Sequence, residues 1–346
     1  MHMERLSTLN LSLLMRSSVM TTQNRLASAQ AEATSGRHHD VGLALGKEIG
    51  SDIRWRTHLD ALAKLADRVE LSGNRADLTQ STLDAVEKLG ASFMETLAGA
   101  RGAAAGQSLA SAAAKSALLA LTGLMNVTYD GEFVFGGINS ASPPISKYEG
   151  GPAEASVNDA FLAAFGFLPA DAASATITGP AMKSFLDGPL AALFTSPAWG
   201  DDWSAAASEG VTTRLGAGLV VDASTTPAKA GIAALAEALT MAFALGEGNL
   251  GQPAFEAVVD KALSLVALAQ QSIGNERARV GLAQEQMTSA LDRYQVRTAI
   301  LTRNVAALEG VDPYEAASRV NALMSQLEVS YTLTGKLMGL SLVNFI

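Results

Sequence analysis

The sequence predicts a mainly α-helical fold, in which N- and C-terminal arms form a long antiparallel helical rod and carry an inserted α+β outer domain. Hydrophobic residues make up 48% of the chain but aromatic residues only 5%, so alanine and leucine dominate and favour helix. Apolar residues recur every seven positions in both arms, which is coiled-coil spacing. Nine of the ten prolines lie between 130 and 260, so this stretch differs from both arms.

The sequence of the N-terminal arm predicts two helices separated by a turn. In residues 3–34, Leu6, Leu13 and Met20 lie seven apart, with Leu9 between the first two. Gly36 follows in "TSGRHHD", and glycine is a common helix stop. A second helix is expected from about 43 to 100. Its seven-residue ladder consists of Trp55, Leu62, Val69, Ala76, Leu83, Gly90 and Leu97.

The sequence of the C-terminal arm predicts two helices of the same kinds in reverse order, a long helix and then a terminal helix. The long helix has its own ladder, which consists of Ile273, Val280, Met287, Tyr294, Leu301 and Leu308. "EGVDP" then breaks the pattern, because a residue before proline disfavours helix. Asp312 can cap a last helix that has Pro313 at its first position and continues to the end of the chain.

The distribution of charge and proline along the chain predicts three structural parts. Residues 1–40 and 312–346 are expected to be terminal helices, and residues 41–150 and 262–311 a long-helix rod domain with a hairpin near 128–145. Residues 151–261 are expected to form an acidic α+β outer domain. The stretch 130–260 holds fifteen acidic and four basic residues, so we expect this domain to be separable from the arms.

Short strands and helices are predicted in this middle region. Strands are indicated by "YDGEFVFGG", "ATITG" and "TRLGAGLVVDAS", in which β-branched or aromatic residues stand beside glycine or other turn residues. Helices are indicated by "NDAFLAAFGF", "AMKSFLDGPLAALF" and "KAGIAALAEALTMAFAL".

Composition excludes several classes of site and partner. The chain has no cysteine, so it has no disulfide, thiolate nucleophile or cysteine–zinc site. Its net charge of −9 argues against nucleic acid as a partner. No apolar run is expected to reach the roughly 18 residues of a membrane helix, the best being Ile232–Leu245, so no membrane insertion is expected. Polar residues interrupt the first helix, so a cleaved signal peptide is not expected either.

No motif predicts catalysis, a cofactor or a metal. "GLALGKE" has the wrong glycine spacing for a phosphate-binding loop, and a glutamate stands where serine or threonine should be. His38, His39 and Asp40 are too few for a zinc site and are expected to form a polar turn. The adjacent carboxylates of "DDW" at 201–203 have no histidine or basic cluster beside them and are expected in a solvated loop. We therefore expect no enzymatic activity.

The terminal helices are the candidate site, because their apolar stripes carry few charges. Residues 315–346 contain only Glu315, Arg319, Glu328 and Lys336 as charged residues. The stripes could pack on the chain's own core, but the sequence favours self-assembly. If the helices pair, Leu13 or Met20 should face Leu327, Tyr331 and Met338. The candidate interface residues are Leu6, Leu9, Leu13, Met20, Val320, Leu323, Met324, Leu327, Tyr331, Leu337, Met338, Leu342 and Phe345.

Both arms resemble a known family. "VDPYEAASRVNALMSQLEVSYTLTGKLMGLSLVNFI" resembles the closing segment of flagellins and their axial relatives, and "SIGNERARVGLAQEQMTSAL" resembles the helix before it. "RLST", followed by a helix and "TSGR", is similar to the opening of the same family. The acidic, proline-containing stretch that usually follows that turn is replaced here by "HHDVGLALG".

Within this family, "GEFVFGGINSASPP" is similar to the hairpin of the hook–filament junction proteins, the third hook-associated proteins. The resemblance implies a structural flagellar protein that is exported through the type III apparatus and assembles outside the cell by its terminal helices. The implied partners are copies of itself, the hook-side junction protein, flagellin and an export chaperone. Two alternatives are a filament flagellin and an extracellular binding or adhesion module displayed on a helical stalk.

Overall fold

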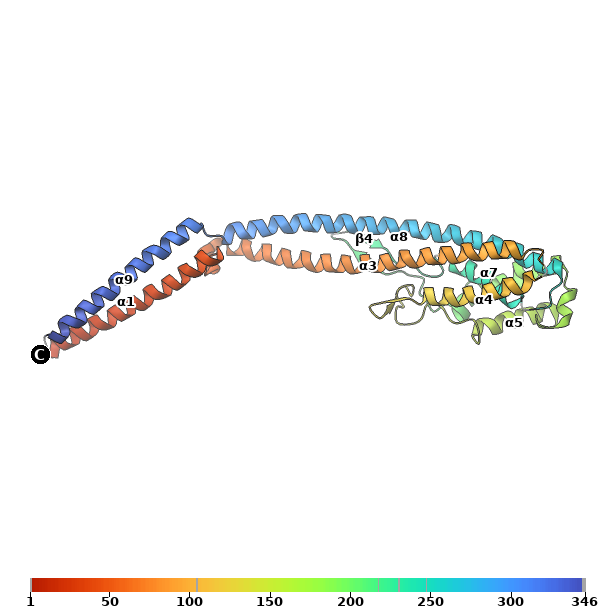
Figure 1. Cartoon of the computed structure of the whole chain (residues 1–346), viewed down its shortest axis with the longest axis horizontal. Coiled ribbons are helices and arrows are strands. Elements are labelled where there is room, and N and C mark those ends of the chain that lie inside the picture. Colours follow the sequence, from red (N-terminus) through yellow and green to blue (C-terminus); the bar gives the residue numbers. More distant parts are fainter. Residues whose placement is uncertain (1, 104, 217, 230, 247, 344–346) are drawn as a thin grey trace. The chain divides into compact units, whose positions relative to one another are not determined.

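The computed structural model describes the whole chain except residues 1, 104, 217, 230, 247 and 344–346, and it is predominantly helical (Figure 1). The predicted fold class is confirmed, since the described strands form only two two-stranded sheets. The elements in chain order are α1 (His2–Ser35), α2 (Val41–Leu45), η1 (Gly46–Glu48), α3 (Ile49–Ala100), α4 (Gly106–Met125), β1 (Thr128–Tyr129), β2 (Glu132–Phe133), α5 (Pro152–Phe165), η2 (Ala172–Thr176), α6 (Gly179–Phe185), η3 (Leu186–Leu190), η4 (Trp199–Trp203), β3 (Thr212–Arg214), β4 (Val220–Asp222), α7 (Ile232–Ala244), α8 (Gln252–Glu309) and α9 (Pro313–Val343).

The chain divides into two compact units. Unit 1 comprises residues 1–64 and 294–346, and unit 2 comprises residues 65–293. The long helices α3 and α8 each contribute to both units. The three-part division predicted from composition stays a prediction.

In unit 1 a buried carboxylate ties three helix ends together, the end of α1, the start of α3 and the end of α8. Glu309, the last residue of α8, is 2% exposed and forms ion pairs with Arg37 and Arg56. Arg56 also donates to Oδ2 of Asp52 over 3.1 Å. Burial alone would raise the pKa of Glu309, but the hydrogen bond from Arg56 and the charges of both arginines outweigh it and hold this pKa below its ordinary value. We call these four residues the clasp.

Backbone hydrogen bonds reinforce the clasp. The His38 N–H donates to the Glu309 carbonyl over 2.9 Å, and the Val311 N–H donates to the Gly36 carbonyl over 3.0 Å. Gly36 has φ +69°, a left-handed conformation that glycine adopts without strain and that ends α1. The chain thereby turns out of α1 and into α9 at the same place.

The last helix begins as the sequence predicts. Pro313 is the first residue of α9, and Oδ1 of Asp312 accepts the Tyr314 N–H over 2.8 Å. The carboxylate thus caps one of the amide groups that lack a partner within the helix.

In unit 2 the predicted seven-residue ladders form the buried faces of α3 and α8. Val69, Ala76, Leu83 and Leu97 of α3 are buried, as are Ile273, Val280 and Met287 of α8. Arg277 on α8 pairs with Asp84 at 3.2 Å and with Glu87, both on α3. Together these contacts confirm the heptad prediction for this part of the rod.

The predicted hairpin is present as β1 and β2, which pair antiparallel through Thr128 with Phe133 and Tyr129 with Glu132. Asp130 and Gly131 between them have φ values of 52° and 81°. Positive φ at both central residues is the type I′ geometry that suits a two-residue hairpin, and Asp-Gly favours it.

Residues 151–261 are mostly helical and share their core with the arms. α5, α6 and α7 confirm the three predicted helices. The sequence predicts strands in "TRLGAGLVVDAS", and the structure has β3 and β4 there, paired antiparallel. The strand predicted from "ATITG" is wrong. The Thr178 hydroxyl caps α6 instead, accepting the Ala181 N–H over 3.4 Å.

A single hydrophobic cluster joins α7 to the long helices. It includes Leu235 and Leu239 of α7 together with Phe93 of α3, Leu121 of α4 and Val259 of α8. The expectation that this region is separable from the arms is therefore not supported, because removing it would expose part of their core.

Helix α4, which the sequence analysis did not single out, packs along α7. By length and composition it could cross a membrane, which corrects the expectation that no run is long enough. Core helices have the same composition, and α4 places Ala110, Ala114, Leu118 and Leu121 in the cluster of unit 2.

α7 carries a carboxyl group into this core. Glu237 is 6% exposed, and its Oε1 has no hydrogen-bond partner within the structure as described. Burial raises the pKa of Glu237 to about 7, although the charge of Lys261 opposes the change and that of Asp187 adds to it. Folding therefore favours the protonated side chain.

We expect the Glu309→Gln variant to destabilise the clasp by about 1–3 kcal/mol, at the lower end because both arginines are half-exposed. Hydrogen exchange should become faster at the His38 and Val311 amides. Since the pKa of Glu309 is lowered, its contribution is complete at neutral pH and is lost as the pH falls below 4.5 through that lowered value. The control Glu315→Gln removes an exposed carboxylate and should change little; equal exchange in both variants would contradict the clasp.

We expect the stability of unit 2 to fall as the pH rises from 4.5 to about 7, because the native state holds a proton on Glu237 that the unfolded state releases. Glu237→Gln should remove this slope, on the order of 3 kcal/mol over the range. Urea unfolding at several pH values measures it. The exposed Glu95→Gln control should keep the wild-type slope, and a wild-type profile in Glu237→Gln would refute the assignment.

Candidate assembly interface

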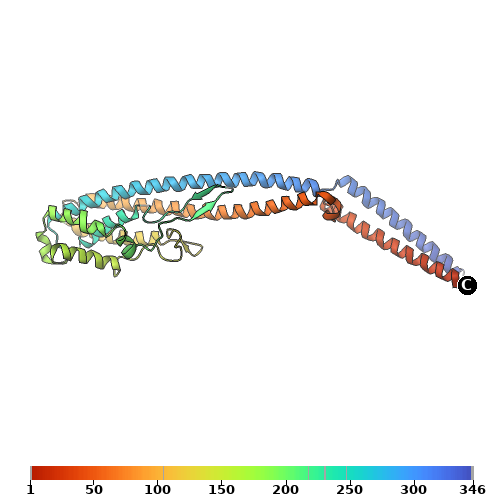
Figure 2. The same cartoon turned by 180° about the vertical axis from the view of Figure 1, so that it is seen from behind.

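Helices α1 and α9 lie side by side and antiparallel within unit 1 (Figures 1 and 2). The Gln23 side chain donates to the Tyr331 hydroxyl over 2.6 Å, and Arg319 pairs with Glu32 at 3.0 Å. From Gln23 to Glu32 the contacts advance along α1, and from Tyr331 to Arg319 they go back along α9, so they fix the antiparallel register.

The two helices meet along a narrow seam. Among the residues whose side chains are described, only Thr22, Ala29 and Ala316 of this pair are fully buried. The half-buried apolar residues follow the same spacing of three and four as these, which is the spacing of a coiled-coil stripe. The seam residues are Met15, Val19, Thr22, Leu26 and Ala29 of α1, with Ala316, Val320, Leu323, Leu327, Ser330 and Thr334 of α9.

The predicted interface residues therefore fall into two groups. Val320, Leu323 and Leu327 lie on the seam within the chain. The others with described side chains point outward: Leu13 is 53%, Met20 64%, Met324 47% and Tyr331 51% exposed. The expectation that Leu13 or Met20 faces the α9 stripe is wrong, because Met15, Val19 and Thr22 occupy that side of α1 instead.

The remaining candidate interface residues are placed by the backbone of their helices. Leu6, Leu9, Leu337, Met338 and Leu342 belong to α1 and α9 by backbone. Phe345 lies outside the described residues.

The sequence analysis missed further outward apolar side chains. Leu14 is 68%, Val329 58% and Leu333 50% exposed. Leu14 follows the named Leu13, and Val329 and Leu333 lie two residues before and after the named Tyr331, so counting every apolar residue rather than one ladder would have found them. These side chains add to the apolar surface that α1 and α9 expose.

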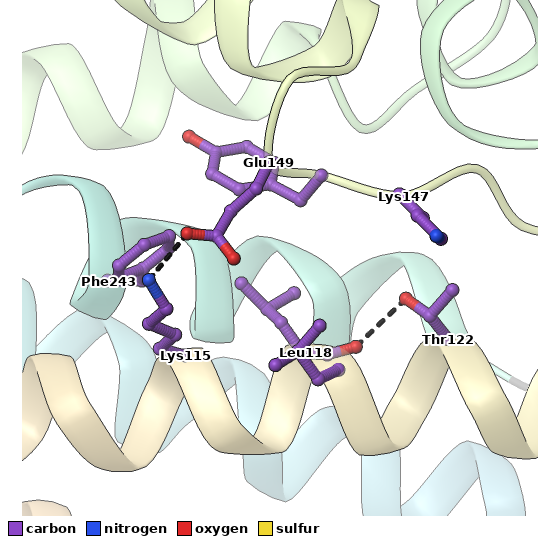
Figure 3. A pocket seen from close by; sticks show the side chains of 8 residues that line it. Lys115, Leu118, Thr122, Lys147, Glu149 and Phe243 are labelled. Atoms are coloured by element: carbon purple, nitrogen blue, oxygen red, sulfur yellow. Dashed lines mark hydrogen bonds and ion pairs between the residues drawn. The ribbon is translucent and has the colours of Figure 1, made fainter.

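A pocket of about 260 Å³ lies in unit 2 between α4, α7 and the segment before α5 (Figure 3). Lys115 pairs with Glu149 at 2.5 Å, and its Nζ lies 5.3 Å from the centre of the Phe243 ring. Thr122, also in the lining, donates its hydroxyl hydrogen to the Leu118 carbonyl over 2.9 Å. The two charges thus neutralise each other, and the arrangement offers no nucleophile with an adjacent base.

The other motifs of the sequence have structural roles. Asp40 caps α2 by accepting the Leu43 N–H over 2.9 Å, and His38 lies 3.7 Å from Glu32. Asp202 accepts the Ser156 hydroxyl hydrogen over 2.6 Å. Within the residues that the structure describes, no three His, Cys, Asp or Glu side chains gather as a metal site.

Comparison with known proteins gives the family. The bacterial flagellin N-terminal helical region matches residues 6–140, and the bacterial flagellin C-terminal helical region matches residues 263–346. Together these matches cover more than half of the chain. No curated protein matches it.

A solved structure from Vibrio parahaemolyticus, assigned as a flagellar hook-associated protein, has the same fold. The TM-score is 0.54 at 11% identity, over 74% of this chain and 95% of that one. Proteins of the flagellin type are exported, extracellular components of the flagellum. Since both flagellin regions are present in the right order, the chain belongs to the bacterial flagellin family and is a structural component of the flagellum.

Proposed function

We propose that the protein joins hook to filament as a junction protein that self-assembles through its terminal helices. The observation that carries the proposal is the hairpin segment "GEFVFGGINSASPP". The likeness to a protein assigned as hook-associated supports it at the level of the fold.

The structure gives this segment a specific packing. After β2, Val134 and Phe135 are buried, and the Ile138 N–H donates to the Glu209 carbonyl over 3.1 Å. Gly137 has φ +63°, and a Cβ there would lie 2.4 Å from that same carbonyl oxygen. Gly137 is therefore needed so that its backbone can approach the backbone of Glu209 this closely.

Arg75 of α3 anchors the hairpin. It donates to the Phe133 carbonyl over 2.9 Å and pairs with Glu132 at 3.2 Å. The hairpin is thus held on a rigid helix, which suits a fixed contact surface in an assembly.

Assembly is proposed to use the outward side chains of α1 and α9. Leu13 and Met20 on one helix and Met324 and Val329 on the other are all exposed in the single chain. Burying the exposed half of each against a neighbouring subunit would contribute about 1 kcal/mol or somewhat more. The partners proposed on this basis are copies of the chain, the hook-side junction protein and flagellin.

Deleting the gene and examining the cells by electron microscopy tests the junction role. We expect hooks without filaments and flagellin shed into the medium, because subunits would have nothing to polymerise on. Normal filaments would contradict the proposal. Loss of filaments without shed flagellin would indicate that the chain is itself a filament subunit.

We expect Met324→Asp to be exported and folded but not incorporated into flagella. The side chain is exposed in the single chain, so the charge should cost little there. In an assembled interface the buried charge would cost several kcal/mol. Immunoblots of sheared flagella and of culture medium measure the two fractions.

The seam residue Leu327 is a poorer choice for this test, since a charge there would also disturb the α1–α9 pair. Gln326→Asp is the matched control, because Gln326 is exposed and already polar. Normal incorporation of Met324→Asp would show that this face is not an interface between subunits.

A further inference from the structure

We propose that Tyr314 of one copy inserts into a groove on unit 1 of a second copy, where α3 and α8 run together. This inference rests on the proposed self-assembly and names one of its contacts. The groove has a volume of about 360 Å³ and is lined by Trp55, His58, Leu62, Arg297, Ile300 and Leu301.

The groove has the composition of a binding site for an aromatic side chain. Its walls are mainly apolar, and Ile300 is 51% exposed. Trp55 offers an indole ring for an aromatic contact, and His58 and Arg297 offer polar groups for a phenol hydroxyl. A few polar groups in an apolar cavity are typical of ligand sites in general.

Tyr314 is the projecting side chain that fits. It is 88% exposed, more than any other large hydrophobic side chain that the structure describes. Pro313 precedes it, and its N–H is held by Asp312, so its backbone is fixed in the first turn of α9. A fixed aromatic residue loses little conformational entropy on binding, which favours it as an anchor.

The same chain does not make this contact, because Tyr314 is 88% exposed and is not among the residues that line the groove. Leu301 is eight residues before the end of α8 at Glu309, a distance of about 12 Å along the helix, and Tyr314 lies beyond that end. The tyrosine and the groove are therefore different surfaces of one unit. A contact between two different surfaces is heterologous, and it builds a ring or an open helical array rather than a symmetric dimer.

The charges of the two surfaces are complementary. Asp312 and Glu315 flank Tyr314, although Glu315 also pairs with Arg319 on its own helix. On the groove side, α8 carries Arg297 and Arg303 and no acidic residue between 294 and 308. The adjoining turns of α3 carry three basic residues against two acidic ones, namely Arg54, Arg56 and Lys64 against Asp52 and Asp60, so the groove side is positive on balance. Opposite charges around an apolar anchor steer the docking partner and fix its orientation.

Cysteine cross-linking tests the contact directly, because the natural chain has no cysteine. Purified full-length protein carrying both Tyr314→Cys and His58→Cys is assembled in sulfate, which strengthens apolar burial, at a concentration high enough to offset the loss of the tyrosine ring, and is then mildly oxidised. We expect a ladder of disulfide-linked multimers on a non-reducing gel. The control pair Tyr314→Cys with Thr57→Cys moves the second cysteine to the next position, away from the groove lining, and should remain monomeric.

Single substitutions give a second readout. Tyr314→Ser should raise the protein concentration needed for assembly about tenfold or more, and Tyr314→Phe should change it by less than about threefold. Circular dichroism should show both variants folded, because the side chain is exposed.

The outcomes separate this contact from the wider proposal. Wild-type assembly without the ladder, or with Tyr314→Ser unchanged, would overturn the Tyr314 contact and leave self-assembly standing. If the wild-type protein does not assemble under any condition tried, both proposals fail.

Discussion

Two helices that pair side by side can bury only one stripe of each, and this constraint governs the terminal part of the molecule. On α1 and α9 the seam takes small or polar residues at several positions, among them Thr22, Ala29 and Ala316. The larger side chains Leu13, Met20 and Met324 remain outside it. The pair therefore has a weak internal core and a strong apolar exterior, a distribution that favours association with further helices over stability of the single chain.

The clasp determines where this helix pair begins. Glu309 is buried and pairs with two half-exposed arginines, one in the turn after α1 and one in α3, and such an arrangement is specific because the buried charge needs both partners in one geometry. The backbone bonds from His38 and Val311 use the same turn. The end of α1 and the start of α9 are thus fixed together. Because the seam buries few side chains, this fixed end helps to hold the two helices in register.

Much of the fold could be predicted from the sequence because heptad spacing and capping are local signals. The buried ladder of Val69, Ala76 and Leu83 and the cap at Asp312 are examples. The seam of α1 was missed because Thr22 and Ala29 are not recognisably core residues, and the ladder of larger side chains seemed the better stripe. The clasp was missed because the partners of Glu309 lie far away in the sequence and only the fold brings Arg37 and Arg56 to it.

The shared core of unit 2 could not be predicted for a similar reason. Proline and acidic residues mark 130–260 as different in composition, but composition does not show that Leu235 and Leu239 belong to one cluster with Phe93.

The composition of this stretch does determine how it interacts electrostatically with other copies of the chain. Fifteen acidic residues against four basic ones make this stretch repel its equivalent in another copy. Residues 315–346 hold only two charges of each sign, so apolar contacts there meet no such repulsion. Charge therefore disfavours association through the acidic region and favours the proposed contacts of unit 1, both on the terminal helices and in the groove between α3 and α8.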